Sequence, residues 1–223
     1  MPPGRQRSAI TVAGFVQAQA PSRHTAEPAS ASQPLAADRT GFVLSEGAVV
    51  VVLESAEHAT ARGARIHAGL AGVGIAADAH PITAPATDGS GKISAMRKAL
   101  TQARMTPQDM SHVNAHITGT PVGDAAEARA IREVFGRATA TASKAALGHL
   151  FGAAGAIEAL IAPPQRAARS HPAHPQLHHR RRRPRHRPRC RRGSTRRPPQ
   201  RAVLSNCFGF GGQNVSLVVA SAR

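Results

Sequence analysis

The chain has 223 residues, and its content of 41% hydrophobic and 3% aromatic residues predicts a globular core built on Ala, Val, Leu and Ile. The net charge of +17 belongs to one segment, because residues 1–158 hold 14 Lys and Arg against 12 Asp and Glu, whereas residues 159–223 hold 15 Arg and no acid. Two cysteines exclude a disulfide framework, and without a secretory leader or an apolar run near ~18 residues we expect a soluble, cytoplasmic protein with no membrane span.

The first third of the chain is predicted to pass from loop into a strand, a helix and a second strand. Residues 1–38 are rich in Pro, Ala, Ser and Gln, so only Ile10 to Phe15 is expected to be ordered, as a short strand or a helix start. The continuous apolar run Val49–Leu53 predicts a strand buried on both faces. Residues 54–65 predict a short helix, and residues 66–75 predict another strand.

The central part predicts two amphipathic helices separated by a strand. The apolar face of the first helix consists of Ile93, Met96, Leu100 and Ala103. Residues 112–115 predict a short strand that leads into a turn. The second helix is predicted to begin at Asp124, whose side chain can cap it, with Glu127 completing a capping box.

The last third combines helix, loop and strand signals. Residues 142–148 predict a loop, small residues at 152–162 predict a closely packed helix, and residues 203–219 return to strand-like sequence around a glycine loop. The alternation of helices and strands along the chain predicts the α/β class. Residues 165–201 contain 14 Arg and five His with almost no branched apolar residue, so we expect disorder there.

Three short motifs carry groups suited to catalysis. His116 follows a predicted strand, Lys144 precedes His149 by five residues at a predicted helix start, and residues 205–212 form the glycine loop. Each motif alone is more often structural than functional. Together, two neutral imidazoles, a lysine and backbone N–H groups are hydrogen-bond donors, which suits an oxyanion or an enolate. A helix N-terminus near His149 would disfavour its protonation and keep it a neutral donor.

The order and spacing of these motifs resemble the beta-ketoacyl-[acyl carrier protein] synthase family. Residues 39–48 are similar to the family's Arg-Asp-Gly-Phe…Gly-Glu-Gly-Ala stretch, and residues 116–120 are similar to its His-Gly-Thr-x-Thr turn. The family's Lys-x4-His-x8-Glu pattern is matched by Lys144, His149 and Glu158, and its Ser-Asn-Ser-Phe-Gly-Phe-Gly-Gly motif by residues 205–212. The resemblance covers residues 39–162 and 202–219, and it is weaker from 10 to 38.

The resemblance implies a thiolase-like layered fold, of which this chain has the C-terminal half. It divides the chain into residues 1–38 as a poorly ordered remnant of the N-terminal half, 39–162 as the C-terminal domain, 163–201 as an Arg/Pro/His-rich insert and 202–223 as the final strands. It implies an acyltransferase of fatty-acid or polyketide synthesis that acts as a dimer. The family condenses acyl and malonyl thioesters with loss of carbon dioxide, using substrates on the phosphopantetheine of acyl carrier protein and no other cofactor.

The resemblance also implies roles for individual residues. His116 and His149 would hydrogen-bond the malonyl thioester carbonyl and stabilise the enolate, with electrostatic support from Lys144. Glu158 would be a buried structural partner near Lys144.

The implied substrate contacts lie on two turns. Thr118 and Thr120 would meet the pantetheine arm. The backbone N–H of Phe210, between Gly209 and Gly211, would help form an oxyanion hole, and the Phe210 ring would gate acyl entry.

Several positions depart from the family pattern. The family's nucleophilic Cys belongs to its N-terminal half, whereas Cys207 here stands at a Ser position and Cys190 lies in the Arg-rich run, so both are expected to be plain thiols and no nucleophile is assigned. Ile117 replaces a Gly after the first histidine, which predicts backbone strain. The histidines of the Arg-rich run have no ligand spacing, so no metal site is expected.

Three interpretations follow from the sequence. The first is a truncated synthase that does not condense substrates alone. The second is a non-catalytic partner of the chain-length-factor type, in a heterodimer with a ketosynthase subunit. The third is a nucleic-acid-binding protein using its Arg-rich run, although such a run also binds nucleic acid adventitiously. The abrupt change of composition between Leu160 and Ala202 suggests a further hypothesis, a pair of compensating frameshifts.

Overall fold

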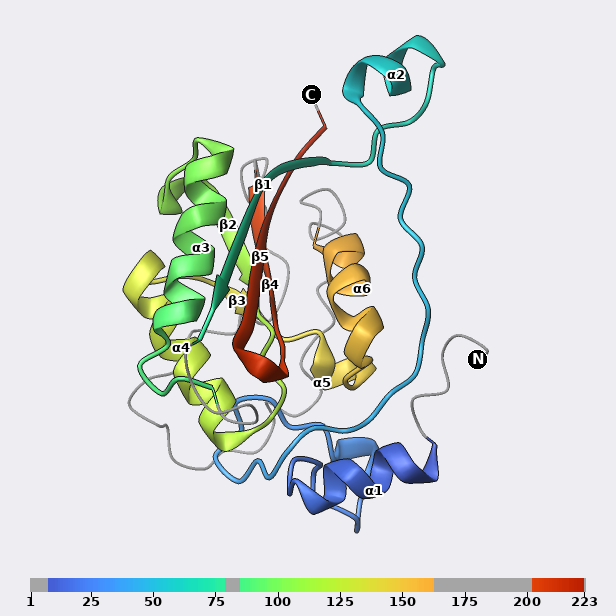
Figure 1. Cartoon of the computed structure of the whole chain (residues 1–223), viewed down its shortest axis with the longest axis vertical. Helices are drawn as coiled ribbons and strands as arrows, with labels where there is room; N and C mark the ends of the chain where they lie inside the picture. The colour runs from blue at the N-terminus through green and yellow to red at the C-terminus, as the bar shows by residue number, and fades with distance from the viewer. Residues whose placement is uncertain (1–7, 79–84, 163–201, 223) are drawn as a thin grey trace.

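A mixed five-stranded sheet is the centre of the structure, a computed structural model that describes residues 8–78, 85–162 and 202–222 (Figure 1). In spatial order its strands are β1 (Gly69–Ala77), β5 (Gln213–Ala220), β4 (Ala202–Phe208), β2 (Met110–Asn114) and β3 (Ala140–Thr141). Strand β5 is antiparallel to both β1 and β4, whereas β2 is parallel to β4 and β3. The α/β class predicted from the sequence is confirmed.

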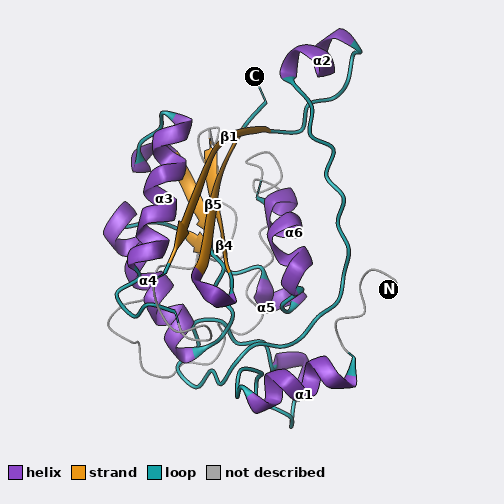
Figure 2. Ribbon diagram, viewed as in Figure 1, coloured by secondary structure: helices purple, strands orange, loops and turns teal. Residues whose placement is uncertain are grey.

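Helices cover both faces of this sheet (Figure 2). One face carries α3 (Ser90–Ala103) and α4 (Pro121–Phe135), and the other carries α5 (Lys144–Leu147) and α6 (Ala154–Ile161). The predicted apolar face of α3 is confirmed, since Met96 and Leu100 are buried against Val113 of β2 and Leu204 of β4. Strand β1 can approach α3 closely because residue 74 is a glycine. A Cβ at this position would lie 1.9 Å from the Ala95 carbonyl oxygen.

The remaining elements are short. They are helices α1 (Ala9–Gln17) and α2 (Ala56–Ala61) and the 3₁₀ turns η1 (Pro28–Ser30), η2 (Pro107–Asp109), η3 (Phe151–Ala153) and η4 (Phe210–Gly212). Ser8 caps α1 by accepting from the Thr11 N–H at 3.3 Å, which settles the predicted strand or helix at residues 10–15 as a helix. Helix α1 lies at the same end of the molecule as α5 and the turn between β4 and β5 (Figure 1).

The prediction of a buried strand at Val49–Leu53 is wrong. This stretch is extended without strand pairing, and it runs along the α6 side of the molecule toward α2 (Figure 1). Val50, Val52 and Leu53 are 89%, 80% and 74% exposed. An apolar run becomes a buried strand only when neighbouring strands and facing side chains surround it, and the described residues supply none here.

Other expectations are also corrected. Helix α4 begins at Pro121, with Thr120 at its N-cap and no side-chain capping bond. Ile117 shows no strain: it is 1% exposed in the core, and Gly119 has the positive φ of this turn, at 94°. The predicted loop at residues 142–148 contains α5. The predicted disorder of residues 165–201 lies outside the described residues.

Candidate functional site

Two histidines from separate motifs meet at one end of the sheet. His116 follows β2 and His149 follows α5, and their ring centroids lie 5.3 Å apart with planes at 81°. The backbone fixes His149, because its N–H donates to the Val43 carbonyl at 2.8 Å and its carbonyl accepts from the Ser45 N–H at 2.9 Å. The segment 39–48 that resembles the family pattern therefore holds the second histidine.

The surroundings of His149 determine its charge and its tautomer. The Phe151 N–H donates to its Nδ1 at 3.1 Å, so in the neutral ring the proton is on Nε2. Burial, helped by the Lys144 charge, lowers the pKa of His149 to about 3. The sequence analysis expected a nearby helix N-terminus to keep His149 neutral. The ring is neutral, but burial is the main cause of its lowered pKa.

His116 is also held neutral. Burial lowers its pKa well below the ordinary value, and the charges of Lys144 and Lys92 act in the same direction, as does His149 when it is protonated. Its Nδ1 is buried without a hydrogen-bond partner among the described residues. Because orphaned buried N–H groups are rarer than orphaned acceptors, the Nε2–H tautomer is favoured here too. Both imidazoles are thus Nε2–H donors.

Lys144 and Glu158 form a buried ion pair behind the histidines. The Lys144 ammonium bonds Oε1 of Glu158, Ser143 Oγ donates to the same oxygen at 2.8 Å, and both charged side chains are 2% exposed. Burial raises the pKa of Glu158, and Lys144 opposes this shift. Ser32 Oγ donates to the Lys144 carbonyl at 2.6 Å, which ties the first turn of α5 to the N-terminal segment.

Two buried carboxylates of α4 hold the turn that carries His116. Glu127 accepts the His116 N–H at 2.9 Å and the Ile117 N–H at 2.8 Å. Asp124 accepts the N–H groups of Thr118 and Gly119, both at 3.0 Å. Burial raises the pKa of both carboxyls against these hydrogen bonds. The sequence analysis predicted that both residues cap their own helix. Their short separation in sequence from the histidine turn was the signal that could have predicted the contact with that turn.

Further bonds complete this support. Asp124 also accepts from the Leu35 N–H at 3.0 Å and pairs with Arg39 at 3.1 Å. Asn206 of β4 donates to Glu127 Oε1 at 3.0 Å. The sequence analysis included Arg39 and Asn206 in family-like motifs but gave them no role, although a buried polar side chain within an apolar strand such as β4 signals a partner.

Aromatic rings surround the histidine pair. Five of the six phenylalanines in the chain contact it or each other: Phe15, Phe42, Phe151, Phe208 and Phe210. Phe151 stacks on His149 with centroids 4.4 Å apart and planes at 8°, and Phe42 meets the same imidazole edge to face at 5.4 Å. Motif reading missed the contributions of α1 and residue 42, because rings so far apart in sequence converge only in the fold.

Both predicted substrate turns, at residues 118–120 and 209–211, lie within the described part of the structure. Thr118 is buried, and its Oγ1 lies 3.1 Å from Oγ1 of Thr120. In the glycine loop, Gly211 has φ at 79°, and Phe210 is 48% exposed with its ring 6.1 Å from that of Phe15. The Gly209 N–H donates to the Gln213 carbonyl at 2.7 Å, so it is not available to an oxyanion.

Cys207 lies on β4 and packs against α6. A Cβ on Gly155 would lie 3.1 Å from its sulfur. Burial and the Glu158 charge raise the pKa of its thiol, which disfavours the thiolate. Cys190 is outside the described residues. The described ranges hold no cluster of His, Cys, Asp and Glu suited to a metal ion, and none of their helices is long and apolar enough to cross a membrane.

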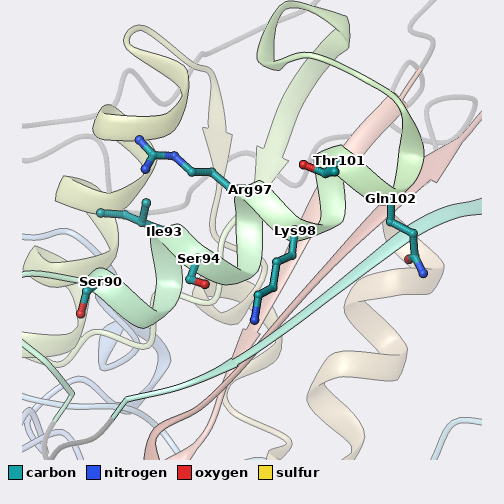
Figure 3. Close-up of a pocket in the computed structure, with 7 residues that line it drawn as sticks. All are labelled: Ser90, Ile93, Ser94, Arg97, Lys98, Thr101 and Gln102. Carbon is teal, nitrogen blue, oxygen red and sulfur yellow. The ribbon is translucent and has the colours of Figure 1, made fainter.

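A shallow hollow lies on another part of the molecule, along the exposed side of α3 (Figure 3). Lys98 and Gln102 point from it toward the edge strand β1, where Lys98 Nζ donates to the Ile75 carbonyl at 3.0 Å and Gln102 accepts from the Val73 N–H. The histidines and their partners do not line this hollow.

Comparison with known proteins places these features in a family. Residues 67–169 match the model of the beta-ketoacyl synthase C-terminal domain. The chain is similar to the mitochondrial 3-oxoacyl-[acyl-carrier-protein] synthase of Arabidopsis thaliana, with 44% identity over 96% of this chain and 48% of the relative. The chain spans about half the length of the curated relatives it matches.

Two solved structures give the same result. A beta-ketoacyl synthase from Burkholderia phymatum STM815 superposes with a TM-score of 0.83 at 36% identity, over 97% of this chain and 52% of the other. The ishigamide ketosynthase/chain length factor superposes with a TM-score of 0.82 at 32% identity, over 96% of this chain and 51% of the other. The described fold matches the C-terminal half of ketosynthase structures.

Proposed function

Because the chain belongs to the beta-ketoacyl synthase family and carries its C-terminal domain, we propose that it stabilises the enolate formed when a malonyl thioester on acyl carrier protein loses carbon dioxide. The observation that carries this proposal is the pair of neutral Nε2–H imidazoles, His116 and His149, beside buried Lys144. We propose acyl carrier protein as the carrier of the malonyl group because the Arabidopsis relative is named a 3-oxoacyl-[acyl-carrier-protein] synthase.

The chemistry needs donors rather than a base. The bond between the malonyl methylene carbon and its carboxylate breaks, and the electron pair moves to the thioester oxygen as carbon dioxide leaves. Two neutral N–H groups stabilise the new oxyanion without giving up a proton in advance, and removal of one such donor typically costs about 10²–10³ in rate. Lys144, held by Glu158, adds positive charge in a buried environment, where charges interact strongly.

Decarboxylation and condensation place different demands on this chain. The enolate collapses to an acetyl thioester when it takes a proton, which requires no nucleophile. Condensation requires an acyl-enzyme, and the raised pKa of the Cys207 thiol makes it unfit for that role. We therefore propose that a thiolate other than that of Cys207 carries the acyl group. We also propose that this chain by itself forms no 3-ketoacyl product.

The test measures both outcomes with purified chain and malonyl-[acyl carrier protein]. We expect release of carbon dioxide and formation of acetyl-[acyl carrier protein], reduced about 10²-fold or more by His116→Ala or His149→Ala. His58→Ala is the matched control, because His58 is exposed on α2. Carbon dioxide release that is unaffected by both histidine variants would refute the enolate role, and 3-ketoacyl product from the chain alone would refute the second proposal.

A second candidate function, that of a partner subunit, is supported by an exposed apolar surface. The exposed apolar residues Val50, Val52 and Leu53 form an unpaired extended stretch, as in a chain that pairs with another subunit. In that role the chain would be a partner of a Cys-bearing ketosynthase, as in the chain-length-factor arrangement named for the ishigamide structure.

A further inference from the structure

Lys92 is a buried cation on helix α3 that belongs to none of the sequence motifs. The residue is 4% exposed, its ammonium lies 3.9 Å from Oδ2 of Asp78, and it lies 5.2 Å from the ring centre of Phe208. Phe208 in turn faces His116, with ring centres 6.0 Å apart. Lys92 thus contacts the aromatic ring that contacts the first histidine.

This position is an unfavourable one for lysine. Lys92 is the third residue of α3, whose first turn has no acidic residue, and a cation near a helix N-terminus opposes the helix dipole. Removing an ammonium from water is also costly unless a partner compensates. An apolar residue would fill the same space without either cost. Residues that break local rules in this way are most often found at functional sites.

Asp78, the partner of Lys92, is bonded to the glycine loop. The Asp78 N–H donates to the Gly212 carbonyl at 2.8 Å, and its Oδ1 accepts from Asn214 Nδ2 at 2.8 Å. A Cβ on Gly91 would lie 1.9 Å from that Oδ1, so only glycine lets the carboxylate approach the start of α3 this closely. Lys92 therefore neutralises the carboxylate that anchors the glycine loop.

We propose that Lys92 is a positioning residue of the enolate site, which holds the glycine loop through Asp78 and adds a second positive charge beside His116. The proposal rests on the function proposed above for the histidines. Two cations near a neutral imidazole would favour negative charge on a group that accepts its N–H.

Charged and titratable groups from several elements lie around His116. After burial, Lys144 on α5, then His149 and then Lys92 on α3 act to lower its pKa. The carboxylate of Glu127 on α4 accepts the backbone N–H of His116. Removing the Lys92 charge leaves the other three groups in place, so its contribution can be isolated.

The experiment follows the protonation of His116 by NMR in the ¹⁵N-labelled chain from pH 8 down to about pH 2, because its pKa is well below the ordinary value. The resonance is assigned by its loss in His116→Gln. We expect Lys92→Met to raise the pH of half-protonation by about 0.5–1 unit, because one cation is removed. Lys92→Arg keeps the charge and should stay near the wild type. Lys98→Met is the matched control, since Lys98 lies on the same helix but points to the edge of β1.

A His116 titration curve that is the same in Lys92→Met and wild type would overturn the proposal, as would an equal shift in Lys98→Met. Should Lys92→Met not fold, Lys92→Gln makes the same comparison with a polar side chain. The contact with the glycine loop is measured separately, by hydrogen exchange of the Asp78 amide. Its N–H donates to the Gly212 carbonyl, so its exchange should be faster in Lys92→Met if Lys92 holds Asp78 in place. None of these readouts requires catalysis. A shifted curve in a chain that releases no carbon dioxide would refute the enolate function alone.

Discussion

At the scale of single residues, burial gives His149 its chemical character. In the folded chain its pKa is about 3, against 6.5 for an ordinary histidine. Between these pH values the unfolded chain binds a proton that the folded chain does not bind, so lowering the pH favours unfolding. The contribution of His149 to stability is therefore complete above about pH 6.5 and decreases as the pH falls toward 3. A neutral donor at pH 7 and sensitivity to acid have the same cause.

This sensitivity can be measured with His149→Asn, which no longer titrates and whose Oδ1 can accept the Phe151 N–H in place of Nδ1. Between pH 6.5 and pH 5, the variant should lose ~1.6 kcal/mol less unfolding free energy than the wild type. A fully protonated unfolded histidine would give about 1.4 kcal/mol per pH unit, and at pH 6.5 it is half protonated. Urea unfolding at several pH values measures this difference. Equal slopes for His149→Asn and the wild type would show that His149 titrates normally in the folded chain.

At the scale of elements, α4 acts as the support of the histidine turn. Asp124 and Glu127 lie on its buried side and accept backbone N–H groups from residues 116–119 rather than from their own helix. Such bonds fix the backbone of a turn that has no regular secondary structure. The position of His116 therefore depends on a helix that follows it in sequence.

Asp124→Ala should destabilise the chain by about 3–4 kcal/mol. It leaves the buried N–H groups of Thr118 and Gly119 and the partly buried N–H of Leu35 without their acceptor, and it removes the partner of Arg39. Glu133→Ala on the same helix is the control, because its ion pair with Arg97 is more than half exposed and should be worth less than about 0.5 kcal/mol. Chemical denaturation measures both, and similar losses for the two variants would contradict the role given to Asp124.

The sequence predicted the elements that depend on local periodicity. Helix α3 follows from spacing alone, because its apolar residues lie on one buried face. The two histidine motifs were found by their residue types and their resemblance to a family. The contacts between motifs could not be predicted in this way: Phe15 and Phe151 are 136 positions apart, and only the fold places them 4.6 Å apart.

The failures share a physical cause, which is that burial depends on partners rather than on residue type. Val49–Leu53 has the composition of a buried strand and is exposed, whereas Lys92 has a surface side chain and is buried beside Asp78. The burial of Val49–Leu53 was predicted from composition, whereas Lys92 belongs to no predicted motif. Neither outcome could be predicted without knowing which surfaces face these residues.

At the scale of the whole molecule, we expect the exposed stretch at residues 49–53 to be the surface through which the chain associates. Side chains two positions apart in an extended segment lie on the same side. Val50 and Val52 are 89% and 80% exposed, while Val51 between them is 42% exposed. The outward side is thus apolar along the stretch. Monomeric proteins rarely expose such continuous apolar surface, so we expect it to bind a second copy or a ketosynthase subunit.

Replacing both Val50 and Val52 by Lys tests this expectation. The charges would prevent burial of the outward side, while both positions are too exposed to affect the core. The wild type should elute above its mass of 23.2 kDa or co-purify with a Cys-bearing ketosynthase, and the double variant should do neither while keeping its melting temperature. Val122→Lys, at a 51% exposed position on α4, should behave like the wild type. If the double variant associates as the wild type does, the stretch is no interface, and the chain-length-factor interpretation loses the observation that favours it.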